Sequence, residues 1–287
     1  MQKTPDLHTH STASDGTLTP GELVARAAAA GVEVMALTDH DTLDGIAEAL
    51  RVARQTELRL IPGVEVSVTW GGRTLHIVGL DIDPSSATLR QGLAGLQHYR
   101  TWRAEEIGRR LEKAGFAGAL DGARAQAAGS LIGRTHFARF LVQRGAARDL
   151  RAVFKDYLVS GKPGHVAGDW ATLEQAVTWL RAAGGVAVIA HPARYGFTAT
   201  KMRRLIAEFK DCGGRGLEVV SGSHSRDDYL VFGRRAAEHR LLASAGSDYH
   251  GPENPWIELG RLPPLPDGCT PIWSLPGFGR SGAQAAA

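Results

Sequence analysis

The sequence predicts an α/β protein with a helical insertion, and two patterns support this. Within residues 1–84 and 165–276, short apolar strands alternate with helical stretches, and polar side chains of metal-binding type follow one strand after another. Residues 85–164 lack strand-like runs and carry apolar residues at roughly helical spacing. Because parallel α/β folds place active sites at the carboxyl ends of their strands, we expect the site in the α/β part. Segment 277–287 is expected to be a disordered tail.

The first helix has clear boundary signals. Thr19 is a suitable N-cap, Pro20 occupies the first helical position, and Glu22 completes a capping box. Gly31 is typical of a helix C-terminus. A second helix is expected at 173–183, and strands are expected at 32–37, 58–61, 74–80, 186–190, 216–220 and 241–244.

Composition excludes several classes of protein. The chain has 287 residues, of which 43% are hydrophobic and 22% charged, so it can bury a core without disulfides. Its two cysteines, Cys212 and Cys269, lie far apart, which fits a reducing compartment. A net charge of +3 gives no strong nucleic-acid signal. The N-terminus is polar and no apolar run reaches the length of a membrane span, so we expect a cytoplasmic protein with no membrane contact and no obligate protein partner.

Candidate metal ligands recur at the ends of the expected strands. His8 and His10 are two residues apart, as are Asp248 and His250, and in a strand such pairs point to one side. One histidine alone would more often be a surface or core residue, but the repetition favours a metal site. Imidazole and carboxylate ligands without thiolate suit zinc, manganese or iron. The candidate ligands are His8, His10, Asp15, His40, Glu65, His76, His191, Asp248 and His250.

Five short motifs, in this order, resemble those of the PHP (polymerase and histidinol phosphatase) family. They are His8-Thr9-His10, Thr38-Asp39-His40-Asp41, Gly63-Val64-Glu65, Ala190-His191-Pro192 and Ser247-Asp248-Tyr249-His250. The resemblance implies a distorted seven-stranded β/α barrel with a trinuclear metal site at the carboxyl ends of its strands.

The resemblance also implies how the ligands are shared. The first ion would be held by His8, His10, Glu65 and Asp248, the second by Glu65, His76 and His191, and the third by Asp15, His40 and His250. Two or three divalent ions are therefore expected. The carboxylate at Asp15 makes manganese or iron more plausible than zinc, and manganese is favoured.

Segments 132–139, 157–163 and 221–225 resemble the bacterial 3′,5′-nucleoside bisphosphate phosphatases. The implied reaction is removal of the 3′-phosphate by a metal-bridging hydroxide, giving nucleoside 5′-phosphate and phosphate. The resemblance makes Arg134, Lys162 and Arg194 candidates for binding the phosphate that is not cleaved. It makes His136 and His224 candidates for phosphate binding or for protonating the leaving oxygen.

Other functions stay open. The chain could act as a 5′→3′ exoribonuclease on short 5′-phosphorylated RNA, since an RNA 5′ end presents a similar pair of phosphates. Histidinol phosphatase activity and a non-catalytic metal-binding module are less favoured. Around the site, Asp39 is expected to orient a ligand and Asp41 to cap a helix starting near Leu43. Trp170 and Trp179 are expected to be packing residues.

Overall fold

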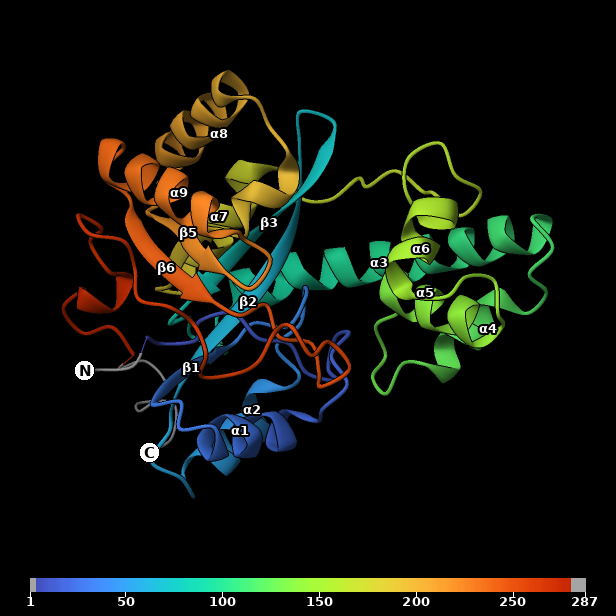
Figure 1. Ribbon diagram of the computed structural model, residues 1–287, viewed down its shortest axis with the longest axis horizontal. Coiled ribbons are helices and arrows are strands. Elements are labelled where there is room, and N and C mark those ends of the chain that lie inside the picture. The colour runs from blue at the N-terminus through green and yellow to red at the C-terminus, as the bar shows by residue number, and fades with distance from the viewer. Residues whose placement is uncertain (1–3, 280–287) are drawn as a thin grey trace.

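The computed structural model describes residues 4–279 and shows a curled six-stranded mixed sheet covered by helices, with a helical lobe to one side (Figure 1). The strands follow chain order from β1 to β6. The strands are β1 (Val34–Leu37), β2 (Arg59–Trp70), β3 (Arg73–Leu80), β4 (Val186–Ile189), β5 (Gly216–Ser221) and β6 (Leu242–Gly246). The flanking helices are α1 (Pro20–Ala29), α2 (Ile46–Ala53), α7 (Leu173–Ala182), α8 (Ala199–Asp211) and α9 (Arg226–Glu238).

Strand direction changes in the middle of the sheet. Pairing is parallel between β1 and β2 and from β4 to β6, whereas β3 is antiparallel to both its neighbours. The expected α/β class is confirmed, but the described residues form six strands rather than seven. Residues 5–10 make only isolated bridges, from Asp6 to Met35 and from Thr9 to Tyr249.

The segment at residues 5–10 nevertheless connects the two edges of the sheet. Its backbone N–H groups donate from Asp6 to Val34 and from Leu7 to Ala245, each at 2.9 Å. The first pairs it with β1 and the second with β6. Because the segment lies between the edge strands, the histidines that follow Leu7 face the interior of the curled sheet.

Local sequence signals explain most element boundaries. At α1, the Thr19 hydroxyl accepts from the backbone of Glu22, and the Glu22 side chain accepts from the backbone of Thr19, which is the expected capping box. Gly31 follows the helix with φ of 74°, a conformation that glycine adopts without strain. One strand differs from expectation, since β2 continues past Glu65 to Trp70 instead of ending before it.

The expected insertion is helical. It comprises α3 (Ala87–Lys113), α4 (Ala119–Ala125), α5 (Arg134–Gln143), α6 (Leu150–Val153) and a π-helical turn at Phe154–Leu158. Figure 1 shows α3 running from the sheet into this lobe. The lobe has its own hydrophobic cluster, in which Ile107, Phe137 and Leu141 are buried, whereas Leu89 and Leu93 of α3 pack into the main cluster. The hydrophobic cluster of the lobe therefore begins within α3, on the C-terminal side of residue 85, where the insertion was expected to start.

Two further findings concern the chain as a whole. Phe278 is buried and the N–H of Gly279 donates to Asp81, so ordered structure extends into the expected tail. The rest of that tail lies outside the described residues. None of the helices in residues 4–279 is long and apolar enough to cross a membrane.

Candidate metal centre

Glu65 lies at the centre of the site and is fully buried in β2. Its Oε2 atom lies 3.3 Å from Nε2 of His8 and 3.3 Å from Nε2 of His10. Its Oε1 atom lies 3.0 Å from Nδ1 of His76 and 3.0 Å from Nε2 of His191. Nδ1 of His40 also lies 2.8 Å from Oε2, so three histidines face one oxygen and two face the other. A carboxylate whose two oxygens face different ligands can be shared between two ions.

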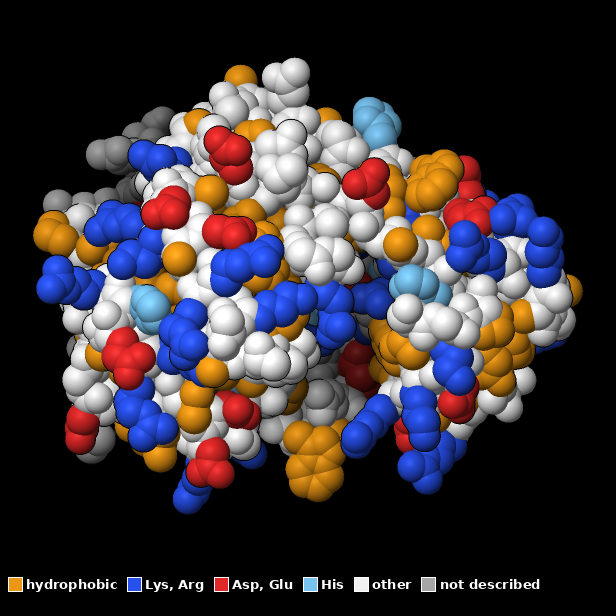
Figure 2. Space-filling model, turned by 90° about the horizontal axis from the view of Figure 1, so that it is seen from above, with side chains coloured by type: hydrophobic (Ala, Val, Ile, Leu, Met, Phe, Trp, Pro, Cys, Tyr) orange, Lys and Arg blue, Asp and Glu red, His pale blue; other side chains and the backbone are white. Residues whose placement is uncertain are grey.

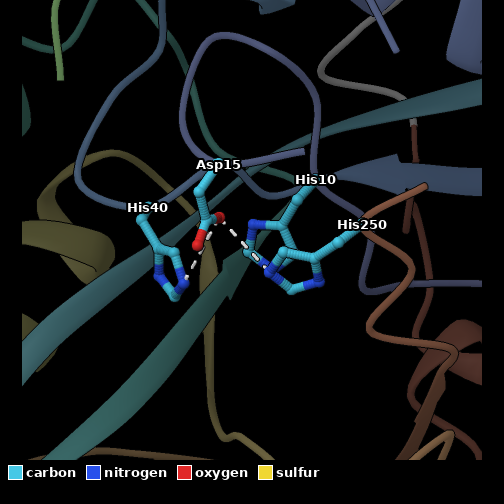
Figure 3. Close-up of side chains that lie close together, drawn as sticks. All are labelled: His10, Asp15, His40 and His250. Carbon is cyan, nitrogen blue, oxygen red and sulfur yellow. Dashed lines mark ion pairs between the residues drawn. The ribbon is translucent and has the colours of Figure 1, made fainter. Parts of the chain in front are cut away.

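A second group of side chains surrounds Asp15 (Figure 3). Its Oδ1 atom lies 3.2 Å from Nε2 of His250 and 3.9 Å from Nε2 of His40. His10 joins this group, and one ligand atom from each of the four residues lies within 4.8 Å of the others. Asp15 comes from a loop, and the three histidines come from segments following Leu7, β1 and β6. The curl of the sheet therefore brings together residues that are far apart in the sequence.

The ligand atoms fit coordination by cations better than hydrogen bonding to one another. Several are buried and have no hydrogen-bond partner among the described residues, namely Nε2 of His8, Nε2 of His10, Nδ1 of His40, Oδ1 of Asp15 and Oε2 of Glu65. Leaving such atoms unpaired costs about 1–3 kcal/mol each, so their convergence needs a ligand to explain it. Two further overlapping groups, His8–His10–Glu65 and His40–Glu65–His76, have the same geometry.

The charges of the cluster are strongly interdependent. Burial alone would raise the pKa of Glu65, but His76, His40 and His8 outweigh it, and the pKa lies well below its usual range. Burial lowers the pKa of His10 to about 3 and that of His76 to about 4. These three positions favour carboxylate and neutral imidazole, the forms that bind metal. At His8, His40 and His250 burial would lower the pKa, but nearby carboxylates outweigh it and raise the pKa, to about 9 for His250, so a metal ion would displace protons there.

Glu218, which was not predicted from the sequence, orients two candidate ligands. This buried residue on β5 has Oε1 2.9 Å from Nδ1 of His8, while its Oε2 accepts from the backbone N–H of His191 at 2.5 Å. A hydrogen bond to the outer nitrogen of a liganding imidazole fixes its tautomer and orientation. The available signal was a single acidic residue in the apolar run Leu217–Val220.

Asp39 and Asp41 act differently from each other. Asp39 accepts from the backbone N–H of Ser11 at 2.8 Å and from the hydroxyl of Ser14 at 2.6 Å, so it holds the loop that carries Asp15. The expectation that Asp41 caps a helix is wrong, because the N-cap of α2 is Gly45. Instead Asp41 accepts from the backbone N–H of Ser67 at 2.7 Å.

A cavity of about 140 Å³ adjoins the cluster, and four arginines line it. Arg134 and Arg194 were expected here, whereas Arg100 and Arg103, on α3, were not predicted from the sequence. Burial, with repulsion from Arg134 and Arg100, lowers the pKa of Arg103 to about 9. Figure 2 shows Lys and Arg side chains gathered around a hollow between the lobes. A larger cleft of about 900 Å³, beside α2, is lined by no histidine.

Three other candidate substrate residues do not line this cavity among the described residues. Lys162 is exposed on a turn of the insertion. His136 is buried, and its Nδ1 accepts from the N–H of Gly133 at 3.0 Å, at the start of α5. His224 is also buried, with Nδ1 3.0 Å from the carbonyl of Val219. Their predicted roles in catalysis and substrate binding therefore stay predictions.

Comparison with known proteins agrees with this geometry. The PHP domain family model matches residues 6–166, which contain six of the candidate metal ligands. This chain belongs to the PHP family. All nine candidate ligands of this PHP protein belong to the groups described above or form ion pairs with members of those groups. For example, Nε2 of His8 lies 3.6 Å from Oδ1 of Asp248.

The PHP protein is also similar to individual members of known function. It is 50% identical to a 3′,5′-nucleoside bisphosphate phosphatase of Chromobacterium violaceum, over 93% of this chain and 94% of that one. It is 46% identical to a 5′-3′ exoribonuclease of Haemophilus influenzae, over 95% of this chain and 99% of that one. A solved structure of an amidohydrolase from Chromobacterium violaceum, with bound sulfate and no metal, has a TM-score of 0.91, 50% identity and 94% coverage of both chains. Together with the ligand groups, these similarities support a metal-dependent phosphoesterase.

Proposed function

We propose that this protein removes the 3′-phosphate from nucleoside 3′,5′-bisphosphates, such as adenosine 3′,5′-bisphosphate, to give the nucleoside 5′-phosphate. The observation that carries the proposal is a single cavity lined both by candidate metal ligands and by four arginines. A substrate with two phosphates needs both, since one phosphate is cleaved and the other is only held. The Chromobacterium relative named for this activity supports the same substrate class.

The metal cluster provides the reacting part of the cavity. We infer that Glu65, His8, His10 and Asp248 would hold one ion, and that Glu65, His76 and His191 would hold a second. A third ion would be held by Asp15, His40 and His250. When bound, divalent ions supply a water molecule of lowered pKa and positive charge opposite the phosphoryl oxygens. The ligand set suits manganese, with iron or zinc as alternatives.

The arginines provide groups that can bind a phosphate. Arg100 pairs with Asp41 at 2.6 Å and Arg194 pairs with Asp248 at 2.7 Å, so each already has a carboxylate partner. Arg134 has no hydrogen bond to an acceptor within residues 4–279; its guanidinium lies over the ring of Phe154. It is therefore available to a phosphate, which an arginine can bind through two parallel hydrogen bonds.

Arg103 adds to these groups. It is nine-tenths buried, donates to the carbonyl of Val166 at 3.0 Å, and its Nε atom has no partner among the described residues. Repulsion among three neighbouring guanidinium groups is relieved when an anion binds between them. The arrangement thus favours a second phosphate beside the one at the metal cluster.

His136 and His224 have positioning roles in this proposal. The ring of His136 holds the first turn of α5, next to Arg134. Nε2 of His224 accepts from the N–H of Ala193 at 3.3 Å, in the 3-10 turn Pro192–Tyr195 that carries Arg194. Both histidines therefore act on cavity arginines through the backbone.

A second candidate function is 5′→3′ exoribonuclease activity on short 5′-phosphorylated RNA. The similarity to the Haemophilus exoribonuclease favours it, at 46% identity over 95% of this chain. The cavity is too small to enclose a whole nucleotide, since such pockets usually measure about 300–1,000 Å³. The base and any following nucleotide would then extend into the open hollow (Figure 2).

Phosphate release with Mn²⁺ tests the proposal. Adenosine 3′,5′-bisphosphate, AMP and histidinol phosphate would be compared at equal concentrations. Cleavage of 5′-phosphorylated RNA dinucleotides releases mononucleotides rather than phosphate, so it would be followed by chromatography of the products. We expect fast release from the bisphosphate, with AMP left intact. A higher kcat/KM on the dinucleotides would favour the exoribonuclease, and preference for histidinol phosphate would overturn the two-phosphate interpretation of the arginines.

A further inference from the structure

The insertion contacts one candidate metal ligand directly. The hydroxyl of Thr135, on the first turn of α5, donates to Oδ2 of Asp15 at 2.8 Å. Arg139, one turn further along the same helix, donates to the backbone carbonyl of Asp15 at 2.9 Å. Thus α5 holds both the side chain and the backbone of a residue that belongs to the other lobe.

The second carboxylate oxygen of Asp15 is left for a different partner. Its Oδ1 atom is buried without a hydrogen bond among the described residues and faces His250 and His40. Because Thr135 occupies Oδ2, rotation of the carboxylate is restricted and Oδ1 stays directed at the two imidazoles. This is the geometry of a carboxylate prepared to bind an ion through one oxygen.

Two other candidate ligands are oriented by residues outside the insertion. His8 is held by Glu218 of β5, and the backbone of His76 is held by the hydroxyl of Tyr195, to which its N–H donates at 3.0 Å. Within residues 4–279, Asp15 alone among the candidate ligands has a side-chain hydrogen bond to the insertion. The contact between Thr135 and Asp15 is therefore the place where the insertion acts on the metal cluster.

Thr135 itself lines the cavity, beside Arg134. Arg134, the preceding residue, has its guanidinium in the cavity, and both residues lie at the start of α5. α5 packs in the hydrophobic cluster of the insertion, through Phe137 and Leu141. A displacement of α5 toward a bound phosphate would move Arg134 and Thr135 together, since they share one rigid helical turn.

We propose that Thr135 is a positioning residue for Asp15, and that the insertion thereby sets the affinity of the ion held by Asp15, His40 and His250. The inference rests on the proposed metal site but not on the identity of the substrate. Hydrogen-bond partners of metal ligands typically contribute about 10–100-fold to metal affinity. We expect an effect of that size, confined to one ion.

Two matched variants test this role. Thr135→Val removes the hydroxyl and keeps the shape of the side chain, whereas Thr135→Ser keeps the hydroxyl. Metal-free protein would be titrated with Mn²⁺ in a calorimeter, and bound manganese counted after equilibrium dialysis. We expect Thr135→Val to lower the affinity for one ion by about 10–100-fold, and Thr135→Ser to bind all ions with nearly wild-type affinity. Equal affinities for all ions in Thr135→Val and wild type would overturn the inference.

A double variant shows whether Thr135 acts through Asp15. In an Asp15→Ala variant, adding Thr135→Val should leave the affinities of the remaining ions unchanged. A further weakening would mean that the substitution disturbs the fold in general, and the inference would fail. Failure of the proposed function is distinguishable, because then wild-type protein would bind ions and the two Thr135 variants would still differ in affinity, but no phosphate would be released from adenosine 3′,5′-bisphosphate.

Discussion

Oε1 of Glu218 lies 2.9 Å from Nδ1 of His8, and this contact determines which nitrogen of His8 faces the metal cluster. With Nδ1 held by the carboxylate, Nε2 is directed at Glu65, 3.3 Å away. Glu218 also accepts from the backbone of His191. One buried carboxylate on β5 therefore orients candidate ligands on two separate segments, residues 5–10 and the turn that follows β4.

We predict that Glu218→Gln lowers manganese affinity by about 10–100-fold, the usual cost of losing a partner of a liganding histidine. The amide keeps one acceptor oxygen, so it can satisfy His8 or His191 but not both. Metal content after dialysis against defined free Mn²⁺ measures the effect. Glu238→Gln, at an exposed position on α9, is the matched control. Unchanged metal content in Glu218→Gln would contradict the role of this contact.

For Arg134→Ala we predict a loss in kcat/KM on the bisphosphate of about 10–150-fold, because a hydrogen bond to a charged group contributes about 1.5–3 kcal/mol. On a nucleoside 3′-monophosphate, which lacks the second phosphate, the loss should be small. Initial rates on both substrates measure the difference.

Lys162→Ala serves as the comparison for Arg134→Ala. Lys162 is exposed and does not line the cavity among the described residues, so we expect a smaller loss than at Arg134. A larger loss at Lys162 would show that the turn carrying it moves into the cavity when substrate binds.

Metal binding should raise thermal stability. At a concentration about 100 times its Kd, one ion contributes about 2.7 kcal/mol, which for a chain of this size raises Tm by about 4–5 °C. Differential scanning calorimetry of chelator-treated protein with and without Mn²⁺ measures this shift. Mg²⁺ is the control, because it prefers oxygen ligands and the cluster is rich in imidazole. The histidine assignment would be wrong if Mg²⁺ stabilised the protein as much as Mn²⁺.

We predict that His224→Ala destabilises the fold. The substitution leaves the N–H of Ala193 and the carbonyl of Val219 without their partner, and each buried group left unpaired costs about 1–3 kcal/mol of stability. The Tm of the metal-free variant measures this, and His224→Gln, which keeps a donor and an acceptor, should be milder. An unchanged Tm with an altered shape of the pH–rate profile would instead indicate a direct proton-transfer role.

Local patterns in the sequence determined much of the architecture. The capping box at Thr19 and the strand positions depend on neighbouring residues and on the period of apolar side chains, which a single sequence displays directly. The two-residue spacing of His8 and His10 and of Asp248 and His250 likewise indicated a shared site. Six of the nine candidate ligands follow, or lie in, a strand of the structure, whereas His8 and His10 were indicated by their spacing and Asp15 lies in a loop.

Contacts between distant segments were decided only by the tertiary structure. Arg100 meets Asp41 across 59 positions in the sequence, and Glu218 meets His8 across 210. No local pattern encodes such pairs, because they depend on how the sheet curls and how α3 lies against it. Residues 5–10 likewise lie between β1 and β6 and make only isolated bridges there. The sequence by itself thus determined which residues could bind metal, whereas packing decided which side chains hold them in place.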